Sequence, residues 1–536
     1  MSTVLDPARL IGAGTQFPSE RYNHMNDLPM SRLIMRKILF IGLLAASTAL
    51  PAQSPVATWT GQHQREIVDE FISLLSIPNV ARNDADMRRN AALLGDMFRK
   101  RGFTVETQQV TSGSPVVLAM LEAAPSSGTL TLYIHYDGQA VDSTDWTKCG
   151  PFAPCVMSPD GKVTLDASVK TFHPEGRIYA RSASDDKGPI MALLAAMDAL
   201  RATGSKPAWS LRVVLDGQEE GGSANFRRFV AASGDKLKAD LAITLDGPRH
   251  PSGRPTMYYG VRGSAGVTIT VLTSRNDLHS GNYGNWAPDP SMLLGRLLGT
   301  MKDSTGRVTI DGFYQDVTPL TPTEKRALAE APDVEAVLAK EFGVSRPERP
   351  DTRLEQKLNE PTLNVLQMEA GGGFSAPGRT AIPASATARL AMRLVHGLDP
   401  AKMNERVIAH VRKQGYFVVV NRDATEEERL AHPLLARIDA RGGRAATRVS
   451  MDEPMAQAVA KALTRGAITP VQLPTLGGSM PFGEFSEQLR LPTVGVSLVN
   501  HDNNQHGPDE NLKLRNLWEG IDLLASILTM SRPTRL

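Results

Sequence analysis

Residues 179–189 read Tyr179-Ala180-Arg181-Ser182-Ala183-Ser184-Asp185-Asp186-Lys187-Gly188-Pro189, and the rest of the chain is organised around this stretch. The apolar run that follows it, Ile190 to Leu200, predicts a helix. Acidic side chains at the start of a helix are stabilised by the positive end of its dipole. Taken alone, the Asp185-Asp186 pair is therefore more commonly explained by a solvated helix start.

Acidic and histidine residues recur at the ends of several predicted strands, and this recurrence changes the interpretation of the Asp185-Asp186 pair. Apolar strands end in His135-Tyr136-Asp137, in Glu219-Glu220 and in Asp246, and a strand and short loop near the C-terminus end in Gln505-His506. Such residues recurring after successive strands indicate one crevice at the carboxyl edge of an α/β sheet. A carboxylate at its centre is placed to bridge two metal ions.

The length of 536 residues suggests two domains. The alternation of strand and helix up to Asp246 predicts an α/β domain with a mixed or parallel sheet. After it, strand, helix and strand patterns predict a small α+β sandwich over residues 257–425. We therefore expect a catalytic domain in two parts, 53–256 and 426–536, with the sandwich inserted. The net charge of +2 gives no reason to expect nucleic acid or a membrane surface as a partner.

The N-terminal residues have the pattern of a targeting segment. Met35-Arg36-Lys37 is basic, Ile38 to Ala46 is apolar, and small residues follow up to Ala52. Residues 35–52 thus predict a secretory signal peptide, and residues 1–34 an overextended start of translation. We expect an exported protein, periplasmic or secreted, without a stable membrane span in its mature form, although an uncleaved anchor is the alternative.

The chain has two cysteines, Cys149 and Cys155, in one long loop. In an exported protein they can pair as a small staple, and two free thiols are the alternative.

The complete set of motifs resembles the co-catalytic zinc family of carnosinase-type dipeptidases, aminoacylases and succinyl-diaminopimelate desuccinylase. The resemblance spans nearly all of the mature chain. It is carried, in order, by His135-Tyr136-Asp137-Gly138, Ser184-Asp185-Asp186-Lys187-Gly188, Glu219-Glu220-Gly221-Gly222-Ser223, Asp246-Gly247, Asp277-Leu278-His279-Ser280-Gly281 and His506. The Asp-Asp-Lys-Gly-Pro form, with Leu-His-Ser-Gly and Arg393-Leu394-Val395, is most similar to the dipeptidase branch.

The resemblance implies two Zn²⁺ ions per subunit, with Mn²⁺ or Co²⁺ as alternatives. His135 and Asp246 would bind one ion, Glu220 and His506 the other, and Asp185 would bridge them. Asp137 would support His135 from behind. Glu219 would act as the general base.

The resemblance also implies a homodimer through the inserted domain, which would act as lid and dimerisation domain. His279 would reach the neighbouring subunit's active site and stabilise the oxyanion of the tetrahedral intermediate. Arg393 would bind the substrate carboxylate. Thr380, Gly478 and Ser479 match positions that line the substrate site.

Three functions remain open from the sequence. The first is a di-zinc metallopeptidase that hydrolyses dipeptides or short peptides. The second is an N-acyl amino acid amidohydrolase with the same metal chemistry. The third, a catalytically inactive binding protein, is disfavoured because no ligand of the family pattern is missing. The sequence departs from that pattern at Ala180-Arg181-Ser182, and segments 149–173 and 303–360 are enlarged, which leaves the size of the substrate open.

Overall fold

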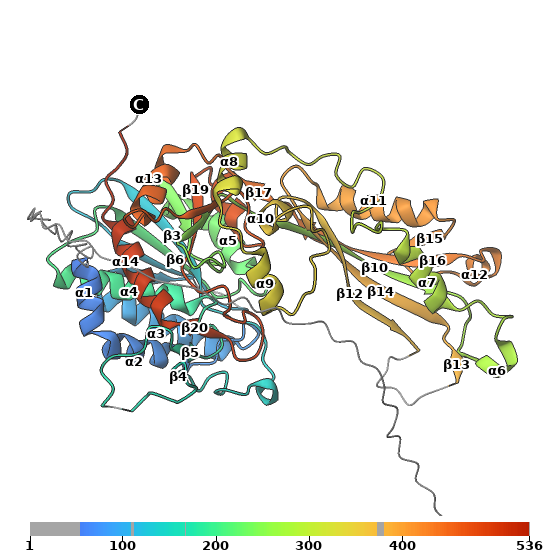
Figure 1. The fold of residues 1–536 in the computed structure, drawn as a ribbon, viewed down its shortest axis with the longest axis horizontal. Coiled ribbons are helices and arrows are strands. Elements are labelled where there is room, and N and C mark those ends of the chain that lie inside the picture. The colour runs from blue at the N-terminus through green and yellow to red at the C-terminus, as the bar shows by residue number, and fades with distance from the viewer. Residues whose placement is uncertain (1–53, 109–111, 167, 372–379, 535–536) are drawn as a thin grey trace, which may run out of the picture. The chain divides into compact units, whose positions relative to one another are not determined.

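A computed structural model describes residues 54–108, 112–166, 168–371 and 380–534. The predicted signal peptide and overextended start lie outside these ranges. Residues 53–536 form one compact unit (Figure 1). Within the described ranges, no helix has the length and apolar character needed to cross a membrane.

The first sheet has eight strands in the order β1-β2-β6-β3-β7-β19-β8-β18. Their bounds are β1 Thr104–Thr107, β2 Val117–Leu121, β3 Thr129–His135, β6 Ser210–Asp216, β7 Leu241–Thr244, β8 Thr256–Tyr258, β18 Val471–Leu473 and β19 Thr493–Ser497. The central strands β6, β3, β7 and β19 are parallel to one another, whereas β1, β2 and β8 run antiparallel to a neighbour. The sheet is therefore mixed, and the carboxyl ends of its four parallel strands meet at one edge.

Helices cover both faces of this sheet. On β3, Leu130, Leu132 and Ile134 point to the face packed by the main helical layer, while Tyr133 points to the other face and packs with Phe226 and Phe485. The main layer comprises α1 Pro55–Gln62, α2 Gln64–Leu75, α3 Asp84–Lys100, α4 Lys187–Ala202, α13 Pro454–Leu463 and α14 Leu514–Leu528, and the opposite face carries α5 Ala224–Ser233 and the short turn of helix Glu484–Gln488. This is the α/β fold that the strand and helix alternation predicts.

Helix α4 is buried along nearly its whole length. Its sequence is apolar on every side apart from a few positions, which is the composition expected of a helix enclosed by other elements. Because α4 begins at Lys187, the preceding Asp185 lies at the start of a rigid, buried helix.

The second sheet has five strands in the order β12-β14-β10-β16-β15. They are β10 Gly263–Leu272, β12 Thr362–Ala370, β14 Ser385–Leu394, β15 Phe417–Val420 and β16 Leu435–Arg444. Helices α7 (Pro290–Gly299) and α11 (Pro400–Lys413) bury their apolar sides against it in a separate core. Figure 1 shows α11 lying along this sheet.

The predicted domain boundaries at 256 and 425 stay a prediction, because residues 53–536 are not divided into separate units. One strand bears on the second boundary. Strand β16 belongs to the five-stranded sheet although it lies after residue 425. We therefore propose that the inserted sandwich ends near residue 445.

The remaining elements are short. They are β4 Cys155–Met157, β5 Arg177–Tyr179 and β20 Asn511–Lys513 in a three-stranded sheet, β9 Gly260–Val261 with β17 Thr447–Arg448, β11 Leu278–His279 with β13 Ala381–Ile382, the 3₁₀ turns Ser143–Asp145 and Gly234–Leu237, and helices α6 Ser280–Tyr283, α8 Pro322–Glu330, α9 Glu335–Glu341, α10 Leu354–Lys357 and α12 Glu426–Ala431. Cys149 and Cys155, left open by the sequence, form a disulfide at the start of β4.

Candidate active site and metal centre

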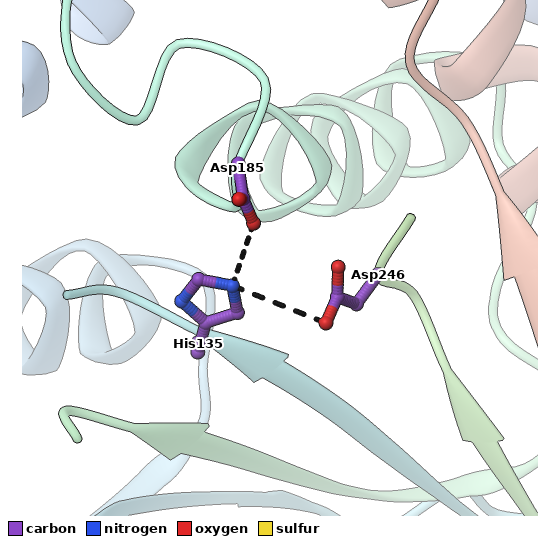
Figure 2. A group of neighbouring side chains, drawn as sticks. All are labelled: His135, Asp185 and Asp246. Carbon is purple, nitrogen blue, oxygen red and sulfur yellow. Dashed lines mark hydrogen bonds and ion pairs between the residues drawn. The ribbon is translucent and has the colours of Figure 1, made fainter. Parts of the chain in front are cut away.

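Three side chains converge at the carboxyl edge of the eight-stranded sheet (Figure 2). His135 ends β3, Asp246 follows β7, and Asp185 comes from the loop that enters α4. The His135 ring Nε2 lies 2.8 Å from Asp185 Oδ1 and 4.0 Å from Asp246 Oδ2. All three side chains are buried, so this cluster is a candidate metal site of one nitrogen and two oxygen ligands.

A second cluster shares Asp185 with the first. His506 Nε2 lies 3.1 Å from Asp185 Oδ2 and 3.4 Å from Glu220 Oε2. Oδ1 of Asp185 therefore faces His135, while Oδ2 faces His506. One carboxylate with an oxygen toward each histidine is the arrangement that a ligand shared by two ions requires.

Asp137 connects the first histidine to the pair of glutamates. Its backbone oxygen lies 3.1 Å from His135 Nδ1, on the opposite side of the ring from Asp185. Its two carboxylate oxygens accept hydrogen bonds from the backbone N–H groups of Glu219 and Glu220, at 3.0 and 3.1 Å. Asp137 thus orients the imidazole and also positions the turn that carries both glutamates.

The charges of the two clusters favour a bound cation. Burial, and then the Asp185 carboxylate, raise the pKa of Glu220 to about 7 and the pKa of Asp246 to about 6. Burial also raises the pKa of Glu219 well above its usual range, helped by Asp246 and Asp137 against the opposing effect of His135. Carboxylates forced together in this way repel one another, and divalent cations remove that cost.

Asp185 itself behaves differently. Burial tends to raise its pKa, but hydrogen bonds from His135 and His506 outweigh burial and hold the pKa below its usual range.

Nitrogen and carboxylate donors in two sets of three suit catalytic zinc and also fit manganese or cobalt. The residues present therefore fit two divalent ions.

The neighbouring Asp186 is not part of either cluster. Its Oδ2 accepts a hydrogen bond from the backbone N–H of His135 at 3.3 Å, and its Oδ1 is buried without a hydrogen-bond partner. The two acids of the Asp185-Asp186 pair thus have different surroundings, as the resemblance implied.

Glu510 is a buried residue that sequence reasoning missed. Its Oε1 accepts hydrogen bonds from the Ser184 and Asp185 backbone N–H groups and the Ser184 hydroxyl, and its Oε2 accepts from the Ser182 N–H and Arg181 Nη1. The same arginine contacts the backbone oxygen of His506 at 3.3 Å. Glu510 therefore joins the loop that carries Asp185 to the loop that carries His506. Its place four residues after His506 was the only available signal.

Replacing Glu510 by glutamine is expected to loosen this loop. An amide has one acceptor oxygen and cannot satisfy all five donors, so Asp185 loses its fixed orientation. Because residues that orient ligands typically contribute about 10–100-fold to metal affinity, we expect a loss of that size. Competition with a fluorescent chelator measures it. Glu427→Gln on α12 is the control, and an unchanged affinity in Glu510→Gln would remove the positioning role.

A cavity of about 610 Å³ opens over the two clusters. Its lining includes Asp185, Glu219, Glu220, Asp246 and His506, and also Arg393, Gly478 and Ser479. Arg393 Nη1 donates to the Ser479 hydroxyl at 3.1 Å. Three of the four predicted substrate residues therefore share one cavity with four of the five predicted metal ligands and with Glu219.

His279 and Thr380 lie elsewhere. They are neighbours at the short two-stranded sheet of β11 and β13, where Ser280 N–H donates to the Thr380 backbone oxygen at 3.0 Å. Both are exposed, and neither is among the described residues that line the cavity. Within one chain, the structure does not bring these two predicted residues to the metal clusters.

Comparison with known proteins agrees with this geometry. The profile of peptidase family M20/M25/M40 matches residues 131–530, which include both clusters and the cavity. The chain belongs to this family. It is therefore a metal-dependent peptide hydrolase with the mixed-sheet α/β fold of these peptidases, as the resemblance implied.

Relatives of this M20 peptidase match over most of its length. A human Beta-Ala-His dipeptidase is 25% identical over 92% of this chain and 96% of its own. A Cys-Gly metallodipeptidase of Schizosaccharomyces pombe is 27% identical over 85% of this chain and 94% of its own. The structure of an M20-family metallo-carboxypeptidase from Sulfolobus solfataricus superposes with a TM-score of 0.68 at 27% identity, covering 86% of this chain and 98% of that one.

The prediction that this M20 peptidase is exported is wrong. The finding that overturns it is its similarity to Cys-Gly metallodipeptidases such as that of S. pombe, which are cytosolic. The residues on which the prediction rested, 35–52, lie outside the described part of the chain.

Proposed function

We propose that this protein is a dipeptidase that hydrolyses the amide bond of dipeptides or short peptides with two divalent metal ions. The observation that carries the proposal is the position of Asp185, whose two oxygens face His135 and His506 separately. The relatives that match most of the chain are named for dipeptide hydrolysis, which supports dipeptides as the substrate class.

The proposed ligands are the two clusters. His135, Asp246 and one oxygen of Asp185 would hold one ion, and His506, Glu220 and the other oxygen of Asp185 the second. When bound, the ions would polarise the scissile carbonyl and make a water molecule nucleophilic at neutral pH. Zinc is the ion that we propose first.

Glu219 is the proposed general base. It lines the cavity, and Asp137 holds its backbone N–H, so its carboxylate is presented to the space between the clusters and the substrate. A raised pKa suits a group that must accept a proton from water and return it to the leaving amine. Glu219 would carry that proton on its carboxylate between the two steps.

Arg393, Gly478 and Ser479 are proposed to bind the substrate carboxylate. The guanidinium offers two parallel N–H donors that match the geometry of a carboxylate. Arg393 forms no ion pair with another described residue. Its hydrogen bond to the Ser479 hydroxyl orients it toward the cavity. A free α-carboxylate at the far end of the substrate would then define the position of the scissile bond.

His279 and Thr380 are proposed to act across a homodimer. Both are exposed and neither is among the described residues that line the cavity, so a second subunit is needed to use them at a site. We propose that the inserted sandwich forms the dimer and that His279 donates a hydrogen bond to the oxyanion in the partner's site.

Replacing His279 by alanine is expected to lower kcat by about 10²–10³-fold, the usual loss when one oxyanion donor is removed, with metal content unchanged. Mixing His279→Ala with an equally inactive Glu219→Gln chain should restore part of the activity, because a mixed dimer contains one complete site. Wild-type turnover in His279→Ala would remove its catalytic role, and failure of the mixture would remove the action across subunits.

The proposed function is tested by amino-acid release from free-amine dipeptides and from their N-acetylated counterparts. The protein is supplied with zinc, and Glu219→Gln is the blank. We expect release from the free-amine set that disappears in the blank. Release only from the acetylated set would make the protein an N-acyl amino acid amidohydrolase, and no release from either would contradict the dipeptidase.

A further inference from the structure

A second guanidinium, that of Arg444, lies in the cavity beside the proposed carboxylate site. Arg444 is the last residue of β16 and lines the cavity together with Ser264 and Arg393. In the sequence it lies after the predicted domain boundary at residue 425, and neither the proposed metal chemistry nor the proposed carboxylate contact uses it.

The sheet register explains why the two arginines meet. Ser264 on β10 is paired with Arg393 on β14 and, on its other side, with Arg444 on β16. Residues directly opposite one another on neighbouring strands point to the same face. Since two strand spacings separate β14 from β16, the two backbones stand about 10 Å apart, within reach of two long side chains that act on one ligand.

A local irregularity places Arg444 in this row. The register between β10 and β16 shifts between Ser264 and Gly266. The adjacent Gly443 is so close to β10 that a Cβ there would come within 2.1 Å of the Ser264 oxygen. Only glycine fits this approach, and a bulge of this kind redirects the following side chain. The backbone is therefore built to bring Arg444 to the cavity.

The charge of Arg444 is only partly compensated. Its Nη2 lies 3.2 Å from Glu484 Oε1, and Arg227 Nη1 is 4.0 Å from the same oxygen. A guanidinium has five N–H donors, so one shared carboxylate oxygen leaves most of those of Arg444 available. The part of the cavity lined by Arg393 and Arg444 is thus positive, in contrast to the acidic residues of the metal clusters that line the same cavity.

We propose that Arg444 and Arg393 form a two-anion subsite that selects substrates whose C-terminal residue is acidic. Arg393 takes the α-carboxylate and Arg444 the side-chain carboxylate of a C-terminal glutamate or aspartate. This inference rests on the proposed peptide hydrolysis and narrows its substrate class. A single carboxylate shared by both arginines is the competing arrangement. A comparison of acidic substrates with their amide counterparts distinguishes the two arrangements.

The test compares isosteric substrates, Ala-Glu with Ala-Gln and Ala-Asp with Ala-Asn, on the zinc-loaded protein. Because a hydrogen bond to a charged group is worth about tenfold or more in binding, we expect wild-type kcat/KM to favour the acidic member by at least that factor. In Arg444→Met the ratio should fall below about twofold, mostly through KM. Arg444→Lys should retain part of the preference, since the positive charge remains.

Arg441→Met is the matched control, because Arg441 is exposed on the same strand and does not line the cavity. It should keep the wild-type ratio. A wild-type ratio near one, or a ratio that Arg444→Met leaves unchanged, would overturn the subsite. If Arg444→Met lost kcat/KM equally for the acidic and the amide member of each pair, Arg444 would be assigned to the α-carboxylate instead.

A binding measurement tests the two-anion subsite independently of the proposed hydrolysis. Calorimetry of Ala-Glu and Ala-Gln with the zinc-loaded Glu219→Gln protein measures the preference without turnover. If wild type hydrolyses neither dipeptide but Ala-Glu binds at least about tenfold more tightly, the dipeptidase fails and the subsite stands. Equal binding of both peptides would contradict the subsite, whatever the reaction proves to be.

Discussion

Replacing Glu219 by glutamine is expected to reduce kcat by about 10²–10⁴-fold while both metal ions and substrate remain bound. The amide keeps the size of the carboxylate but cannot accept a proton from water. The backbone N–H of residue 219 still donates to Asp137, so the turn that carries Glu220 keeps its position. Stopped-time amino-acid release together with metal analysis by mass spectrometry measures the effect.

The size of the loss in kcat distinguishes a role of Glu219 as proton carrier from a purely structural role. We expect KM to stay close to the wild-type value, because Glu219 does not hold the substrate in its ground state. A glutamine variant with more than a tenth of wild-type kcat would contradict the role of general base. A variant that loses metal would instead make Glu219 a ligand.

Replacing Asp185 by asparagine is expected to abolish turnover through loss of metal. Asp185 is the only member common to both clusters, and the amide nitrogen that replaces one oxygen cannot serve as a ligand to the second ion. Without the shared negative charge, the remaining carboxylates and histidines bind two cations poorly. We expect fewer than two ions per chain at micromolar zinc and no measurable amino-acid release.

Asp186→Asn is the matched control for this change. Asp186 is equally buried and adjacent in sequence, but its interactions in the structure are with the His135 backbone. An asparagine oxygen can accept the same bond, so metal content and most activity should persist. If Asp186→Asn lost the ions and Asp185→Asn kept them, the assignment of the shared ligand would be reversed.

The clusters could be predicted because their signal is local. His135, Glu220, Asp246 and His506 end or follow strands of the parallel group, whose carboxyl ends meet at one edge regardless of the details of packing. Asp185 is marked by the apolar run of α4 that comes after it. The resemblance then assigned each residue a role, and the surroundings of Asp185 and Asp186 differ in the direction that it implied. The α/β class followed from the same alternation of strands and helices.

The features that were missed depend on long-range register. Glu510 acts through five hydrogen bonds to residues more than 300 positions away, and no short motif marks such a partner. Arg444 reaches the cavity because of a bulge opposite Ser264, which a strand pattern does not reveal. The pairing of Cys149 with Cys155 was undecided for a different reason, since a spacing of six residues allows free thiols as well as a disulfide.

The sharing of Asp185 by two ions is tested most directly by a crystal structure of the zinc-loaded protein with data collected on both sides of the zinc absorption edge. We expect two anomalous peaks per chain, one beside His135 and Asp246, the other beside His506 and Glu220, with Asp185 between them. A single peak, or two peaks that Asp185 does not contact, would contradict the shared-ligand site.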